Sequence, residues 1–182
     1  QAELAKALGI PVAAIQGRGG QLHETKPVMG PRGGPRGITY PEITEMQIRA
    51  ILESAAELKQ AGKPPKPELM FPVTCDVAEL DQTKAIFDRV KKEVEKQFGA
   101  EVSCPYGTMI EIPRACLLAD HMAKTAEFFS FGTNDLTQMG FGFSRDDIGG
   151  FLPDYLAKKI LKADPFQTID QEGIGQLIRR HA

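Results

Sequence analysis

Two short apolar runs separated by a helical segment constrain the fold of this chain more than any other feature. The runs are residues 108–112, TMIEI, and residues 127–132, EFFSFG, and a helical segment from Pro113 to Thr125 lies between them. A strand, a crossover helix and a second strand form parallel neighbours, which carry polar functional groups at the carboxyl ends of the strands. We therefore expect the side chains that follow the two runs to meet at one edge of a parallel sheet.

Two carboxylates follow these runs. Glu111 sits at the end of the first run, and Asp135 lies just past the second, 24 positions further along the chain. Carboxylate oxygens, with the amide of Asn134 beside them, are ligands that suit Mg²⁺. A solvated strand end for Glu111 and a helix N-cap for the Asn134–Asp135 pair are the structural alternatives.

The residues around Asp135 could complete a site for an anion. The segment from Gly132 through Thr133 to Asn134 would present backbone N–H groups and a hydroxyl, and the glycine leaves room for a ligand to approach. Arg145, ten positions past Asp135, could return over the site and pair with a carboxylate or phosphate. A small oxyacid that chelates the metal would have its enolate stabilised there.

The rest of the chain repeats the alternation of helix and strand. Residues 69–73, LMFPV, read as a buried strand, and the pattern predicts helices at residues 2–9, 41–62, 76–99 and 152–161, with a last helix from about residue 173. Glycines are expected to end the first three of these helices, and Asp76 with Glu79 forms a capping box at the start of the third. A loop is expected between Asp135 and the helix near residue 152. This order predicts an α/β fold with a parallel sheet. Short, evenly spaced strands favour part of a (β/α)8 TIM-type barrel, of which three strands supply less than half. No G-x-G-x-x-G motif marks a dinucleotide-binding fold.

Residues 16–42 are rich in glycine and proline, and the sequence predicts a loop there. Arg18, Arg32 and Arg36 stand among the glycines. The segment could bind an anion through N–H groups and guanidinium, contact single-stranded nucleic acid, or simply be a solvated connection. We predict one partial domain over residues 1–182, with a helix and this loop over 1–42 and βα units over 43–182.

Bulk composition excludes several classes of protein. The net charge is −2, from 22 basic and 24 acidic residues, which gives no general attraction to nucleic acid or an anionic membrane. No apolar run approaches the roughly 20 residues that cross a bilayer. Three cysteines without C-x-x-C spacing favour a reducing compartment, so we predict a cytoplasmic location. Both ends read as cut, which suggests a piece of a longer protein.

Two motifs, GTMIEIPRA and EFFSFGTNDLTQM, give this chain a resemblance to the PEP-utilising enzyme family. The stretches LHETKPVMGPRGGPRGITYPEITEMQ, FGFSRDDIGGFL and DPFQTIDQEGIGQL make it most similar to the dikinase branch of that family. The alternatives are the phosphoenolpyruvate synthase branch, Enzyme I of the sugar phosphotransferase system, or a non-catalytic degenerate fragment that acts as an interaction surface.

The resemblance implies a C-terminal barrel that binds pyruvate or phosphoenolpyruvate. It implies Mg²⁺ on Glu111 and Asp135, and substrate contacts from both of them and from Gly132, Thr133, Asn134, Arg145 and Arg32. Arg32 matches one arginine of a family loop that usually reads GHRGCRLG, whereas this chain reads GPRGGPRG. Pro35 replaces the second arginine, and Arg36 follows one place on.

The resemblance also implies partners that this chain does not contain. In the family, an ATP-binding domain and a swivelling phosphohistidine domain lie upstream, the whole enzyme is expected to be a homodimer, and a catalytic cysteine lies further downstream. Cys75, Cys104 and Cys116 do not match that cysteine. No catalytic residue is therefore assigned in this chain, and no turnover is expected from it alone.

Overall fold

The computed structural model describes residues 1–24 and 29–179, which form two compact units, Gln1–Pro31 and Arg32–Ala182. The first unit contains helices α1, Ala2–Leu8, and α2, Val12–Gln21. Gly9 ends α1 in the left-handed conformation, with φ 65°, as the sequence predicts. Of the hydrophobic side chains described in this unit, only that of Ala5 is buried.

The loop predicted over residues 16–42 is wrong in two places. Helix α2 continues to Gln21 through three glycines. The helix has already begun in VAAIQ, and each further glycine costs it only about 1 kcal/mol relative to alanine. Helix α3 covers Gly34–Thr39, with Pro35 in its first turn, where a missing N–H costs nothing. Residues 25–28 of the predicted loop lie outside the described part of the chain.

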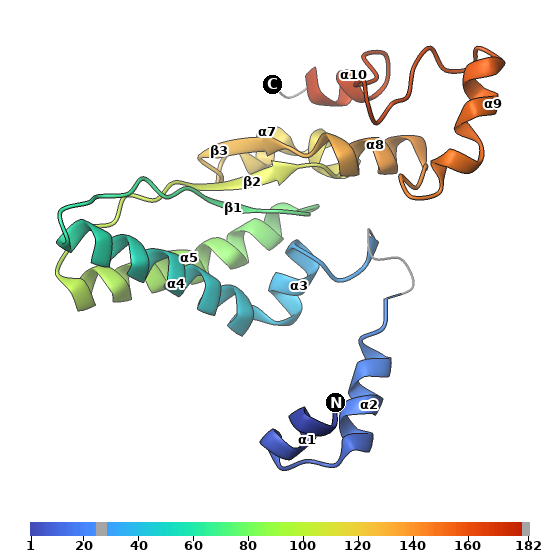
Figure 1. Cartoon of the computed structure of the whole chain (residues 1–182). Coiled ribbons are helices and arrows are strands. Elements are labelled where there is room, and N and C mark those ends of the chain that lie inside the picture. The colour runs from blue at the N-terminus through green and yellow to red at the C-terminus, as the bar shows by residue number, and fades with distance from the viewer. Residues whose placement is uncertain (25–28, 180–182) are drawn as a thin grey trace. The chain divides into compact units, whose positions relative to one another are not determined.

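The second unit is built on a parallel sheet of three strands, β1, Leu69–Phe71, β2, Tyr106–Ile110, and β3, Phe128–Phe131, in the order β1-β2-β3. Two long helices, α4, Pro41–Gln60, and α5, Val77–Phe98, lie together on one side of it (Figure 1). The α/β fold with a parallel sheet is thus confirmed. Strand β2 lies two residues earlier than predicted, so Glu111 comes directly after the strand.

The two faces of the sheet differ in how they are covered. Alternate residues of a strand point to opposite faces, and Tyr106, Thr108 and Ile110 of β2 are all buried. The Tyr106 ring packs 5.4 Å from that of Phe87 on α5, and its hydroxyl lies 2.7 Å from the Thr83 hydroxyl. The other face carries half-buried Met109, and Glu111 follows on that face by parity.

The connections that place the site are short helices. The helix predicted from Pro113 to Thr125 is divided into α6, Pro113–Leu117, and α7, Ala119–Met122. Helix α8, Thr133–Phe141, replaces the loop expected after Asp135, because Leu136 and Thr137 pack into the core there. The chain continues through the 3-10 helix η2, Ile148–Gly150, helix α9, Leu152–Ala157, and helix α10, Ile174–Arg179, which packs on α6 and α8.

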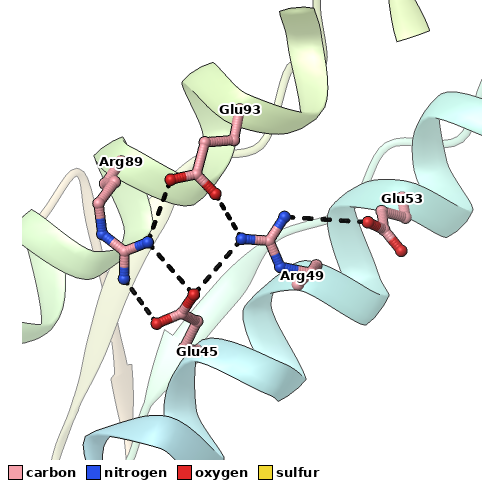
Figure 2. A network of polar contacts seen from close by, with 5 residues as sticks. All are labelled: Glu45, Arg49, Glu53, Arg89 and Glu93. Atoms are coloured by element: carbon pink, nitrogen blue, oxygen red, sulfur yellow. Dashed lines mark hydrogen bonds and ion pairs between the residues drawn. The ribbon is translucent and has the colours of Figure 1, made fainter. Parts of the chain in front are cut away.

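Local signals set the ends of the long helices. Asp76 caps α5 in a capping box with Glu79, and Gly99 ends it at φ 61°, both as predicted. Glu45, Arg49 and Glu53 of α4 form an ion-pair network with Arg89 and Glu93 of α5 (Figure 2). This network joins the solvent sides of the two helices.

Candidate functional site

The carboxyl ends of β2 and β3 bring the two predicted carboxylates to one edge of the sheet. Ile110 and Phe131 are register partners at the ends of these strands. Glu111 follows Ile110 directly, and Asp135 lies in the first turn of α8, which starts just after β3. Neither Asn134 nor Asp135 is the N-cap of α8, since that position belongs to Gly132.

Glu111 is a buried carboxyl group, only 4% exposed. Its Oε1 accepts a hydrogen bond from the Val73 backbone N–H at 2.6 Å. Burial raises the pKa of Glu111 above its ordinary value; the Val73 N–H opposes this, the charge of Asp135 adds to it, and Arg32 lowers it. The site therefore holds a carboxylate that lacks full compensation.

Gly132 gives Glu111 the space that it occupies. A Cβ at this position would lie 2.6 Å from the Glu111 Cβ and 2.7 Å from the Met109 Sδ, which is too close for any side chain. The Gly132 N–H donates to the Ile110 carbonyl at 3.1 Å, which fixes the turn against β2. This contact explains why a glycine precedes α8.

Asp135 is 5% exposed and accepts hydrogen bonds on both oxygens. Arg32 donates from Nη2 to Oδ2 at 2.8 Å, and Asn134 donates from Nδ2 to Oδ1 at 3.0 Å. The structure thus brings Arg32 to Asp135 across 103 positions of sequence.

Arg145 lies on the other side of Asn134. Its Nη1 donates to the Asn134 Oδ1 at 2.7 Å, and its backbone N–H donates to the Gln138 Oε1 at 3.0 Å. The guanidinium lies 5.7 Å from the centre of the Phe166 ring, a cation–π arrangement. Thr133, Asn134, Arg145 and Phe166 line a small cavity of about 140 Å³.

The start of α8 also offers backbone donors. Helix geometry leaves the first N–H groups of a helix without an intrahelical acceptor, and here they belong to Thr133, Asn134 and Asp135. An anion in the cavity beside Thr133 could therefore meet N–H groups, the threonine hydroxyl and the Arg145 guanidinium. All six predicted site residues from Glu111 to Arg145 lie at this edge of the sheet, and Arg32 joins them.

The donor set fits a magnesium ion with open coordination positions. Two buried carboxylates would supply oxygen ligands, and Mg²⁺ is usually held by one or two carboxylates together with water and substrate oxygens. Within residues 1–24 and 29–179, no group of three or more His, Cys, Asp and Glu side chains could enclose a metal. The remaining ligands would therefore have to be amide, water or bound oxyacid.

Sequence reasoning missed the residues that orient the predicted site residues. Val73 adopts φ 54°, a conformation that a β-branched residue avoids and no sequence pattern predicts. Gln138 and Phe166 lie within the family motifs quoted above, but neither residue type nor spacing marks them as partners of Arg145. Burial raises the pKa of the thiols of Cys75, Cys104 and Cys116, so none of them is activated as a nucleophile.

Comparisons with known proteins identify the family to which this chain belongs. Residues 8–182 match the family described as PEP-utilising enzyme, PEP-binding domain. The chain belongs to this family.

Its relatives include several dikinases. It is 52% identical over 177 residues to pyruvate, phosphate dikinase 1 of Arabidopsis thaliana, a protein named as chloroplastic, and 50% identical over 179 residues to pyruvate, phosphate dikinase of Clostridium symbiosum. The Giardia intestinalis pyruvate, phosphate dikinase is 49% identical over 179 residues. These matches cover 97–98% of this chain but 18–20% of the relatives, so the chain spans about a fifth of their length. In the described residues, no helix is long and apolar enough to cross a membrane.

Proposed function

We propose that this chain is part of the phosphoenolpyruvate- and pyruvate-binding barrel of a pyruvate, phosphate dikinase. In the whole enzyme the reaction would be ATP + phosphate + pyruvate = AMP + diphosphate + phosphoenolpyruvate, and this domain would host phosphoryl transfer between a phosphohistidine and pyruvate enolate. The observation that carries the proposal is the pair of buried carboxylates, Glu111 and Asp135, at neighbouring strand ends in a chain about 50% identical to dikinases.

Each residue would have a separate task. Glu111 and Asp135 would hold Mg²⁺, which would supply Lewis-acid stabilisation to the enolate oxygen. Gly132 leaves room for the Glu111 side chain. Thr133 and Asn134 would donate to the oxyacid, and Arg145 would pair with its negative charge. Phosphoenolpyruvate synthase and Enzyme I are less favoured, because the relatives named above are dikinases.

The barrel proposal has support from what the second unit leaves uncovered. Three strands make less than half of a closed barrel of eight. Along α4, beside β1, large apolar side chains are exposed, among them Met46 at 58% and Leu58 at 45%. Hollows of about 530 and 400 Å³ lie along the same helix. Exposed apolar side chains grouped in this way are typical of a surface that packs against further elements.

Several finer expectations follow from this proposal. Residues 1–182 would be one partial domain, and the swivelling phosphohistidine domain and the second protomer would be supplied by the whole enzyme. A cytoplasmic location rests on the free cysteines and the bulk composition. No turnover is expected from this chain alone, since it is assigned no catalytic residue.

Calorimetric titration of oxalate, a mimic of pyruvate enolate, into the chain with Mg²⁺ tests the proposal. We expect saturable binding that is lost in a Glu111→Ala, Asp135→Ala variant. The matched control is an Asp120→Ala, Glu172→Ala variant, which removes two exposed acids with side chains 67% and 81% exposed and should bind as the unmodified chain does. Absence of binding by a chain that circular dichroism shows to be folded would contradict the proposal and favour a degenerate interaction surface.

A further inference from the structure

The glycine-rich loop at Arg32 is packed against the turn that follows β1. The Gly34 N–H donates to the Pro72 carbonyl at 2.9 Å. Gly33 has φ 57°, and a Cβ on it would lie 2.7 Å from the Val73 Cβ; one on Gly34 would lie 2.6 Å from the Val73 carbonyl oxygen. Glycine is thus required at both positions, because only glycine lets these two backbones approach so closely.

These two segments together hold both carboxylates of the site. The turn supplies the Val73 N–H to Glu111 at 2.6 Å, and the loop supplies Arg32 to Asp135 at 2.8 Å. The close packing of the loop on the turn therefore fixes the backbone position from which the Arg32 side chain extends. Pro35 lies in the first turn of α3, and Arg32, just before Gly33, pairs with Asp135.

Arg32 lies on the solvent side of Asp135. The Arg32 side chain is 41% exposed, whereas that of Asp135 is 6% exposed. Any cation that approaches the Asp135 Oδ2 from solvent must meet the guanidinium already bonded to it. Two positive groups at one oxygen repel each other strongly in such a partly buried place, and Mg²⁺ needs an oxygen at about 2.0–2.1 Å without obstruction.

We propose that Arg32 is an exchangeable counter-ion of Asp135, which a divalent cation displaces when it binds there. The inference rests on the proposed function, since it needs a cation at Asp135. Asn134 keeps its bond to the other oxygen, Oδ1, so the carboxylate stays oriented during the exchange. Arg145 is held by an amide oxygen and not by a carboxylate, so the cation does not need to displace it. Cation binding would therefore come first and would free Arg32 for the substrate contact that the family resemblance implies.

The Arg32→Gln variant separates this role from a purely structural one. It should bind Mg²⁺ alone about tenfold more tightly, because no guanidinium competes for Asp135. At saturating Mg²⁺ it should bind oxalate about tenfold more weakly, because the released arginine is missing. The Arg32→Lys variant keeps the positive charge but not the planar guanidinium. Its affinities for Mg²⁺ and for oxalate should lie between those of the unmodified chain and of Arg32→Gln. A structural role would instead weaken both titrations together, and that result would overturn the inference.

The matched control is Arg114→Gln. Arg114 forms an ion pair of the same length, 2.8 Å, with Asp76, and its side chain is 55% exposed. Arg114 bonds to Asp76 and to the Cys75 carbonyl rather than to Asp135. Both titrations should therefore match those of the unmodified chain.

Arginine side-chain NMR reads the exchange directly. The Nε–H signal that disappears in Arg32→Gln identifies Arg32 in the spectrum of the unmodified chain. We expect this signal to shift as Mg²⁺ is added and to shift again with oxalate. An Arg32 signal that does not move at saturating Mg²⁺ would overturn the inference and leave the proposed function standing. If the folded, unmodified chain binds neither Mg²⁺ nor oxalate, the proposed function fails and the inference fails with it.

Discussion

Two groups of acids and arginines in this protein have opposite electrostatic character. In the network between α4 and α5, arginine hydrogen bonds lower the pKa of Glu45 and of Glu93, and every side chain drawn in Figure 2 is at least 31% exposed. At the strand ends, burial raises the pKa of Glu111, although Asp135 has an arginine partner.

The difference teaches what burial does to the same chemistry. Neighbouring arginines stabilise the charged form of an exposed carboxylate, and the resulting ion pairs help to hold the two helices together. A buried carboxylate beside a second one is costly to ionise, and proteins keep such groups mostly where they bind a cation or a substrate. The network is therefore assigned a structural role, and the strand-end pair is where the proposed chemistry would take place.

The largest expected effect is that of Glu111→Gln, which would break the site without breaking the fold. Mg²⁺-dependent oxalate binding should fall at least about 100-fold, because a metal carboxylate is lost. The Tm at pH 7 should rise by about 3 °C, because a buried charge is removed while the amide oxygen still accepts from Val73.

The pH dependence gives the sign of this effect. The folded-state pKa of Glu111 is raised above its ordinary value, so its protonated form contributes stability that is fully present below the unfolded pKa and is lost as pH rises through the folded pKa. The Tm difference between the variant and the unmodified chain should thus grow from pH 4 to pH 7 in thermal melts. A lower Tm for the variant at pH 7 would show that Glu111 is structural, like the acids of the network.

A smaller effect is expected from Phe166→Leu, which tests whether Arg145 belongs to the site. Loss of the ring beneath the guanidinium should weaken oxalate binding about threefold, since an exposed cation–π contact contributes about 0.5–1 kcal/mol. Phe166→Tyr keeps a ring and should keep the affinity.

The control for Phe166 is Phe151→Leu. The ring of Phe151 packs 4.9 Å from that of Phe143 and 5.5 Å from that of Tyr155. The arginine–ring contact described above is made by Phe166. The Phe151→Leu variant should lower the Tm without changing calorimetric oxalate binding. Equal losses of binding in both variants would mean that Phe166 acts only through general packing.

How much of the fold was predictable depended on whether the signal was local. Asp76 with Glu79 and Gly99 fixed both ends of α5 from a few neighbouring residues. Helix α8 was missed because TNDLTQMGF has the composition of a turn, and it is helical because Leu136, fully buried, packs into the core. Long-range packing of this kind overrides local propensity and leaves no periodic pattern.

The same division applies to the candidate site. The rule that neighbouring parallel strands end at one edge was enough to place Glu111 beside Asp135. The partner of Arg32 could not be predicted, because it depends on the packing of two glycines against a left-handed Val73. Sequence motifs thus predict which groups face a ligand, and tertiary packing decides which groups hold them in place.

The smallest expected effect belongs to Arg89→Gln in the helix network. Arg89 donates to Glu45 at 2.6 Å and to Glu93 at 3.1 Å, and its loss should lower the Tm at pH 7 by about 2 °C, as is typical of exposed ion pairs. The pKa of each glutamate is lowered in the folded state, so their contribution is present above the unfolded carboxyl pKa and is lost as pH falls through the folded one. Thermal melts should therefore show the difference at pH 5–7 and none near pH 3, and high salt should reduce it. Oxalate binding should not change. A change in binding, or a Tm difference that persists at pH 3, would mean that the network is coupled to the site and that the contrast between the two groups of charges is wrong.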